Sequence, residues 1–142
     1  MLVVSIISFS YKRGLPVDVS GNGGGYVFDC RWVHNPGRYA EYRAKTGLDI
    51  EVSEFLESDG EIGIFLDGVY RLIDPCVSRY IERGFSSLQV CFGCTGGQHR
   101  SVYSAERLCE HLRSCFSGSD IEVRVEHREL VRLGLEGVLC VE

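Results

Sequence analysis

The chain has 142 residues, of which 44% are hydrophobic and 25% are charged, and its formal net charge is -5. This length is typical of one domain with a single hydrophobic core, so we expect one domain over residues 1–142. The negative charge argues against a protein whose main task is to neutralise nucleic-acid phosphates. No apolar run approaches the ~20 residues that cross a bilayer. The first apolar run has neither the basic segment before it nor the small-residue cleavage site after it that a signal peptide has. We therefore expect a cytoplasmic protein without a membrane segment.

The cysteines are dispersed through apolar segments, and only Cys91 and Cys94 have the C-x-x-C spacing. This pattern is typical of reduced core residues rather than of disulfides. A zinc site would need clustered ligand pairs, and the nearest approach is Cys91, Cys94 and His99, with Cys109 and His111 farther along. The spacing fits a passage from strand to loop better, so the sequence predicts no metal and no cofactor.

The first third of the chain contains two predicted strands joined by a glycine-rich connection. Residues 2–8 are β-branched and short, as in a buried strand. Residues 20–25 include four glycines and predict a flexible loop. The second strand covers 26–30, and Asp29 and Arg31 lie at its carboxyl end. Binding residues of α/β proteins usually gather at that end, so both are candidates for a site.

The middle of the chain changes from loop to helix. Residues 34–49 are polar without a clear period, which predicts mostly loop with one helical turn. A short helix is expected around Ser53–Leu56, followed by a long one over 62–83, where apolar residues recur at helical spacing. Pro75 is expected to kink the long helix, and Gly84 to end it.

The last third predicts a strand at 88–93 and an amphipathic helix at 99–115. Apolar and charged residues alternate over 121–125, the period of a half-exposed strand at a sheet edge. No element is assigned from Glu129 onward. The succession of elements predicts an α/β fold, a small sandwich in which helices flank a mostly parallel sheet.

The segment Gly93–Val102 joins the predicted third strand to the next helix, with two adjacent glycines at the bend. Such a bend lets successive backbone amides point inward, and a helix N-terminus adds unpaired donors and about half a positive charge. Arg100 follows the bend with a planar guanidinium that can hold two phosphate oxygens at once, and Thr95 and Ser101 add hydroxyls on either side of the bend. A bare glycine turn is the alternative, but this combination favours an anion site. The predicted phosphate-binding residues are Thr95, Gly96, Gly97, His99, Arg100 and Ser101.

Cys94 starts a C-x5-R sequence that matches the signature of cysteine phosphatases. In such enzymes the thiolate attacks a phosphorus held by the same loop, and Arg100 and Ser101 have the right chemistry to support it. A general acid is also required, and nothing selects one among Asp29, Asp49, Asp67 and Asp74. A small residue that fits the turn is the simpler interpretation of Cys94, so we predict a protein that is not an enzyme and keep the phosphatase as the alternative.

Several motifs with a fixed order extend over nearly the whole chain. They are Ser8–Pro16, Val27–Arg31, Asn35–Pro36, Thr46–Asp49, Gly93–Val102 and His127–Arg128. With these motifs the chain resembles the C-terminal domain of the RNase adapter protein RapZ family, the group once called P-loop nucleotide-binding YvcJ-like proteins.

The resemblance implies a sheet similar to part of phosphofructokinase, and self-association as a homodimer. It also implies a domain that senses an amino-sugar metabolite, glucosamine-6-phosphate in enterobacterial members, and that binds small regulatory RNA for presentation to RNase E. The family's ligand contacts fall on Thr95, Gly96 and Arg100, with Gly97, His99 and Ser101 in the same loop.

The chain departs from the family pattern at three places. It has no G-x4-G-K-[ST] motif, so nucleotide hydrolysis is not implied. The histidine that follows Asn-Pro in enterobacterial members is Gly37 here, and the adjacent Arg38 becomes an additional candidate beside Asp29 and Arg31. Residues 135–142 lack a basic end, which makes an RNA or RNase partner the weakest implication. The sequence thus predicts a regulatory domain that binds an amino-sugar phosphate or a nucleotide sugar.

Overall fold

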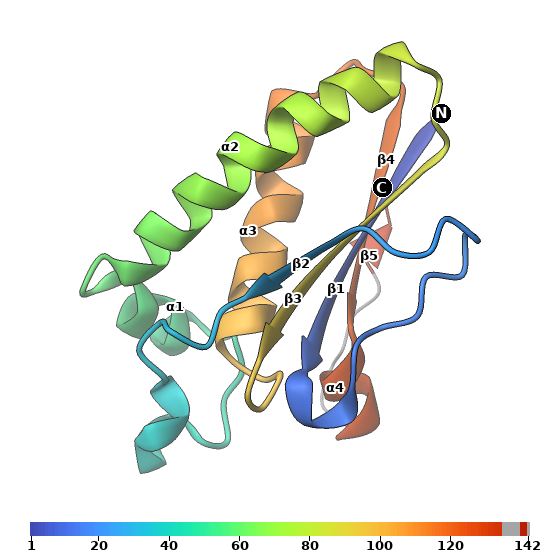
Figure 1. Ribbon diagram of the computed structural model, residues 1–142. Coiled ribbons are helices and arrows are strands. Elements are labelled where there is room, and N and C mark those ends of the chain that lie inside the picture. The colour runs from blue at the N-terminus through green and yellow to red at the C-terminus, as the bar shows by residue number, and fades with distance from the viewer. Residues whose placement is uncertain (135–139, 142) are drawn as a thin grey trace.

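A computed structural model describes residues 1–134 and 140–141 and shows one sheet with the strand order β2-β3-β1-β4-β5 (Figure 1). The parallel strands are β1 (Leu2–Ser10), β2 (Tyr26–Asp29), β3 (Ser87–Cys94) and β4 (Ile121–His127). The short β5 (Cys140–Val141) pairs antiparallel with β4. The predicted α/β class with a mostly parallel sheet is confirmed.

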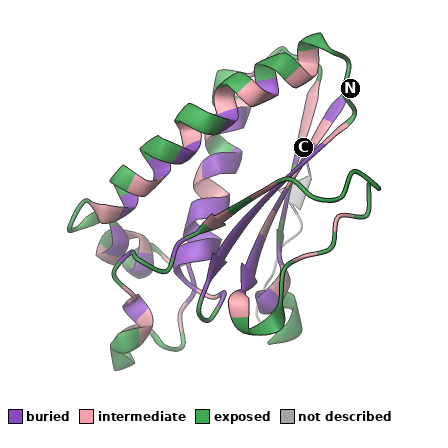
Figure 2. Ribbon diagram, viewed as in Figure 1, coloured by how far each residue is buried: buried purple, intermediate pink, exposed green. Residues whose placement is uncertain are grey.

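The helices are α1 (Ile50–Glu57), α2 (Glu61–Glu82), α3 (Arg100–Cys115) and α4 (Arg128–Arg132). The long helices α2 and α3 cover the same face of the sheet, and α3 contacts β1, β3 and β4 (Figure 1). Figure 2 shows that the outer side of α2 is exposed, whereas much of α3 is buried. The main core therefore lies between α2, α3 and one face of the sheet, and its centre includes Val4, Ile6, Val90, Phe92 and Leu108.

The prediction that β4 lies at a sheet edge was wrong. Arg124 and Val125 pair with β5, so β4 lies between β1 and β5, and β2 is an edge strand. Both long helices cover one face only, so a strand inside this sheet also alternates between buried and accessible residues. Val123 and Val125 are buried, whereas Arg124 is exposed. The alternation of apolar and charged residues in β4 therefore indicates a sheet that helices cover on one face, and not a strand at the sheet edge.

The loop predicted over 34–49 contains two short 3-10 turns, Pro36–Arg38 and Ala40–Tyr42. The short helix begins at Ile50, before the predicted Ser53, and the long helix continues through Pro75. A further short helix, α4, forms in the segment from Glu129 onward to which no element was assigned. The boundaries differ, but the order of elements is the predicted one.

The carboxyl ends of the four parallel strands lie together at one end of the sheet (Figure 1). Register places Ser10 of β1 beside Cys94 of β3, and Ser8 beside His127 of β4. None of the helices within residues 1–134 is both long and apolar enough to cross a membrane. The C-terminal segment on which the expectation of weak RNA binding rests lies largely outside the described residues, which omit 135–139 and 142.

Candidate anion-binding site

The β3–α3 loop, residues 95–99, needs a glycine at its sharpest point. Gly97 has a φ of 66°, a conformation that side chains other than glycine rarely adopt. A Cβ there would come within 2.5 Å of the Glu129 Cγ and 2.8 Å of the Ser10 backbone nitrogen. The loop is thus pressed against the carboxyl end of β1. Ser10 also ties it down, because its hydroxyl donates to the Thr95 carbonyl at 2.5 Å.

Glu129 is the buried carboxylate beneath this loop. It accepts hydrogen bonds from the Ser10 amide at 2.9 Å and from the guanidinium groups of Arg128 and Arg132. Burial alone would raise the pKa of this carboxyl, but these donors bring it below the usual value. Glu129 is therefore an ionised, fully paired support for the loop, and its charge is already neutralised.

Cys94 lies under the loop, buried at the end of β3. Its thiol donates to the Ser101 hydroxyl, with 3.1 Å between Sγ and Oγ, and accepts from the Gly97 amide at 3.2 Å. One loop amide therefore points at the sulfur, and a hydroxyl of the first helical turn lies beside it. These are contacts that would also stabilise a thiolate.

Two side chains of the loop fasten residues 42–47 to the start of α3. Gln98 donates from Nε2 to the Arg43 and Lys45 carbonyls at 2.8 and 2.7 Å. The His99 Nε2 lies 2.8 Å from the Tyr42 carbonyl, so this nitrogen carries the proton and donates it. Burial lowers the pKa of His99, which keeps the ring neutral.

Gly47 explains the Thr46–Asp49 motif. Its amide donates to the Gln98 carbonyl at 2.9 Å, and a Cβ would come within 2.4 Å of the His99 carbonyl oxygen and 2.5 Å of the Tyr103 nitrogen. Asp49 closes the turn by accepting the Thr46 amide at 2.7 Å. This motif therefore provides close packing between a loop and a helix start rather than ligand-binding side chains.

Arg100, the first residue of α3, is a buried cation with only 3% of its surface exposed. Its Nη1 donates to the carbonyls of Arg31 and Val33 at 2.8 and 2.9 Å, which fixes the guanidinium beside the carboxyl end of β2. Within the described residues its Nε has no hydrogen-bond partner and no carboxylate forms an ion pair with it. The side chain is thus held in place without a carboxylate in direct contact, and Asp29 acts on its charge only through a longer-range Coulomb interaction.

Two adjoining cavities meet at Arg100. The loop cavity, about 230 Å³, is lined by Asn35, Gly37, Arg43, Cys94, Thr95, Gly96, Gln98, His99 and Arg100. The arginine cavity, about 340 Å³, is lined by Arg31, Trp32, Val33, His34, Asn35, Arg38, Glu61, Thr95 and Arg100. Four arginines and one carboxylate thus line the two cavities of a chain whose net charge is negative.

The start of α3 adds to this positive potential. Its N-cap residue, His99, makes no capping hydrogen bond with its side chain, and its first turn carries no acidic residue. The first-turn amides and the helix dipole are therefore not neutralised by a side chain of the cap. The combination of helix start, buried arginine and open cavity is suited to a small anion.

Residues 2–131 match the family model of the RapZ C-terminal domain. The chain belongs to the RapZ C-terminal domain family. A nucleotide-binding protein of Fervidobacterium nodosum is 43% identical over 132 residues, which cover 93% of this chain and 43% of that protein. One of Ruegeria sp. (strain TM1040) is 43% identical over 129 residues, 91% of this chain and 40% of that protein. The chain therefore spans about two fifths of the length of these relatives.

In this member of the RapZ family the predicted site residues have different places. Thr95, Gly96, His99 and Arg100 line the loop cavity, and Arg31 and Arg38 line the arginine cavity. Gly97 and Ser101 shape the loop without being among the lining residues. Asp29 forms an ion pair with Arg31 at 2.8 Å, so it neutralises part of the arginine charge.

Several lining residues were not predicted, among them Asn35, Gly37, Arg43 and Gln98. Asn35 had a signal, because an asparagine before Pro-Gly is a typical turn starter, and its side chain accepts the Gly37 amide. Gly37 also lines the loop cavity. Arg43 had no local signal, since it reaches the cavity only through the folding of residues 42–47 onto α3.

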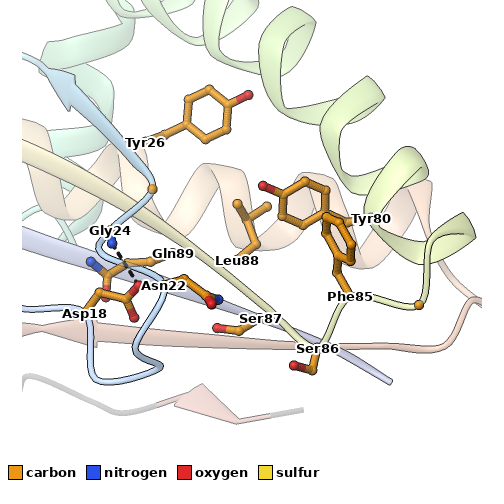
Figure 3. Close-up of a pocket in the computed structure, with 12 residues that line it drawn as sticks. Asp18, Asn22, Gly24, Tyr26, Tyr80, Phe85, Ser86, Ser87, Leu88 and Gln89 are labelled. Atoms are coloured by element: carbon orange, nitrogen blue, oxygen red, sulfur yellow. Dashed lines mark hydrogen bonds between the residues drawn. The ribbon is translucent and has the colours of Figure 1, made fainter.

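A larger cavity, about 450 Å³, lies at the opposite end of the sheet and is called the amino-end cavity (Figure 3). Tyr26, Tyr80 and Phe85 line it together with neutral polar residues of β3, and its one charged lining residue is Asp18. Asp18 accepts the amides of Ser20 and Gly24, which shapes the predicted flexible loop. Ligands of open parallel sheets bind at the carboxyl ends of strands, so this cavity is not the candidate site.

Proposed function

We propose that this chain is a non-catalytic, regulatory binding domain for a small phosphorylated metabolite, an amino-sugar phosphate such as glucosamine-6-phosphate or a nucleotide sugar. The observation that carries the proposal is the buried Arg100 cation, which borders two cavities without a carboxylate partner among the described residues. A buried charge is costly unless an opposite charge compensates it. A phosphate in the loop cavity would supply that charge.

The phosphate would lie in the loop cavity against Thr95, Gly96 and the start of α3, because helix amides and dipole favour an anion there. The rest of the ligand would extend past Asn35 into the arginine cavity, where Trp32 and His34 offer ring and polar contacts. The relatives named nucleotide-binding proteins support a phosphorylated ligand, although the chain covers less than half of each.

A thermal-shift and calorimetric screen tests the proposal. Sugar phosphates and nucleotide sugars should raise the melting temperature, and the matching unphosphorylated sugars should not. Arg100→Ala should weaken binding by about 10- to 150-fold, the equivalent of about 1.5–3 kcal/mol for a charged hydrogen bond. Equal affinity for phosphorylated and unphosphorylated sugars would overturn the proposal.

Matched variants separate binding from folding in this screen. Arg100 also orders two backbone carbonyls, so its loss affects the fold as well. Arg43→Ala removes a loop-cavity cation whose guanidinium donates to exposed backbone carbonyls, so the fold should tolerate it. This variant should weaken binding of the same ligands. Arg79→Ala, an exposed arginine of α2 paired with Glu82, is the control that should bind normally.

A cysteine-dependent phosphatase is the second candidate. It is favoured by the position of the Cys94 sulfur, 3.2 Å from the Gly97 amide and 3.1 Å from the Ser101 hydroxyl. In that case Cys94→Ser would abolish turnover of a phosphate ester, since the thiolate is the nucleophile. A binding domain would keep its ligand affinity in the same variant, so measuring both quantities separates the two functions.

An RNA-binding adapter role stays a prediction of the resemblance. Arg124 is paired with Glu122, and Arg128 and Arg132 are paired with Glu129, so these cations of the C-terminal part are already engaged. An RNA-binding function would require an affinity that falls steeply with salt concentration. A shallow salt dependence in filter binding would reject it for residues 1–142.

A further inference from the structure

A second group of potential ligands lies between α2 and α3, on the helical layer. The carboxylate of Asp74 comes from α2, and the imidazole of His111 and the thiol of Cys115 come from successive turns of α3. The ligand atoms of all three lie within 4.8 Å of one another. The β3–α3 loop and its cavities contain none of these residues.

The imidazole is held in place from two sides. Its Nε2 lies 2.8 and 2.9 Å from the two carboxylate oxygens of Asp74, and the ring of Tyr70 stacks on it with centroids 3.9 Å apart. The side chains of His111 and Asp74 are 21% and 37% exposed, and Cys115 is exposed. The group is therefore ordered yet accessible to an ion from solvent.

We propose that Asp74, His111 and Cys115 form a binding site for a divalent transition metal of the zinc type, with water completing the coordination. Tetrahedral zinc with its usual bond lengths places a nitrogen and a sulfur ligand about 3.5 Å apart, and a nitrogen and an oxygen ligand about 3.4 Å apart. The His111 Nε2 lies 3.7 Å from the Cys115 sulfur. The sulfur also lies 3.8 Å from Nδ1, so binding requires the exposed Cys115 side chain to rotate toward the Nε2 lone pair. The Asp74 oxygen, now at hydrogen-bond distance, must withdraw by roughly half an ångström.

The ligand set also selects the kind of metal. A thiolate and an imidazole favour zinc, cobalt or copper over magnesium and calcium, which prefer oxygen ligands. Binding releases the Cys115 thiol proton to water, and the His111 proton moves from Nε2 to Nδ1 or to water, which leaves a lone pair for the ion. A bound ion would connect α2 to α3 and stabilise their contact.

Cobalt(II) titration of the full chain, with a non-thiol reductant, tests the site. A thiolate–cobalt charge-transfer band should develop in the near ultraviolet, and zinc should displace cobalt and abolish the band. Zinc at 100 times its dissociation constant should raise the melting temperature by roughly 5–10 °C. Magnesium at the same concentration should leave the melting temperature unchanged.

Three ligand variants and two controls decide the outcome. Cys115→Ser should remove the charge-transfer band, and Asp74→Asn or His111→Gln should weaken cobalt binding at least tenfold. Cys76→Ser, a half-buried thiol of α2 outside the group, and Cys94→Ser should keep the band. The proposal is overturned if no thiolate band develops, if the band survives in Cys115→Ser, or if Cys94→Ser abolishes it. Cys115 is exposed, so its replacement should leave the circular dichroism spectrum unchanged.

Discussion

The two ends of the sheet carry cavities of opposite character. At the carboxyl end, the loop cavity and the arginine cavity are the smaller ones, about 230 and 340 Å³, and four arginines line them. At the amino end, a cavity of about 450 Å³ has Asp18 as its one charged lining residue. The largest of these three cavities is thus the one that lacks a cluster of charged lining residues. Charge and backbone geometry, rather than volume, distinguish the end suited to an anion.

The difference follows from strand direction. Parallel strands end together, so the loops after β1, β2 and β3 approach one another and the start of α3 points into their midst (Figure 1). At the amino end, the cavity is bordered by the segment that precedes β2 and by the turn between α2 and β3. Neither of these contributes a helix N-terminus. Variants at the two ends of the sheet test whether the carboxyl end is the one suited to an anion.

The largest effect is expected from Gly97→Ala. The added Cβ meets Glu129 and the Ser10 nitrogen at distances that real contacts do not show, and the positive φ adds backbone strain. We expect a loss of about 3 kcal/mol or more in the free energy of unfolding, measured by urea denaturation. Gly96→Ala is the matched control, because nothing lies within 4 Å of its Cβ. Equal stability of the two variants would show that the loop tolerates displacement.

A smaller effect is expected from the titration of His99. Burial lowers its pKa from the ordinary 6.5, so the unfolded chain takes up this proton at a higher pH than the folded chain. The contribution of His99 is therefore complete above about pH 6.5 and is lost as the pH falls through the folded-state pKa. Urea denaturation from pH 7.5 down to 5.5 should reveal this loss at the carboxyl end.

His99→Gln should flatten this pH dependence, because an uncharged amide can still donate to the Tyr42 carbonyl. His34→Gln provides the control, since His34 is exposed and lies outside residues 42–47 and their contacts with α3. If the free energy of unfolding changed equally with pH in His99→Gln and in the wild type, the neutral state of His99 would not matter for stability. The carboxyl end would then lose one of its distinguishing features.

The smallest effect is expected at the amino end. Asp18→Asn removes the one charged residue that lines that cavity, and the single amide oxygen can still accept from one of the two amides, Ser20 or Gly24, that now bond to separate carboxylate oxygens. Affinity for a sugar phosphate should stay within about twofold of the wild type in calorimetry, since the carboxyl end is untouched. A larger change in affinity would indicate that the two ends of the sheet are coupled. It would otherwise mean that the ligand binds at the amino end, against our proposal.

The sequence predicted the sheet better than it predicted the site. A short β-branched run located β1, a short apolar run located β3, and the helical spacing of Val69, Ile73 and Val77 located α2, because these signals are local. The edge position assigned to β4 was wrong because alternation reports one buried face, whatever lies beside the strand. Contacts between strands are set by tertiary packing that no local pattern contains.

In the loop cavity, Thr95, Gly96 and Arg100 could be singled out because glycines, hydroxyls and an arginine lie together in one loop, and their binding of a ligand stays a prediction. The role of Gln98 was not, since its amide reaches the carbonyls of Arg43 and Lys45, more than fifty residues away. The Arg100 fork was expected to hold two phosphate oxygens, and the structure commits Nη1 to two backbone carbonyls instead. Contact between the other guanidinium nitrogens of Arg100 and a ligand stays a prediction.

The central position of β1 has a consequence for how the chain is made. This apolar strand is synthesised before both of its neighbours in the sheet, yet Ser10 contacts Thr95, 85 residues later, and Ser8 contacts His127, 119 residues later. Its backbone N–H and C=O groups therefore stay without their β3 and β4 partners until most of this chain has been synthesised. Slow folding and a need to protect the newly synthesised β1 are the expected result of such distant pairing.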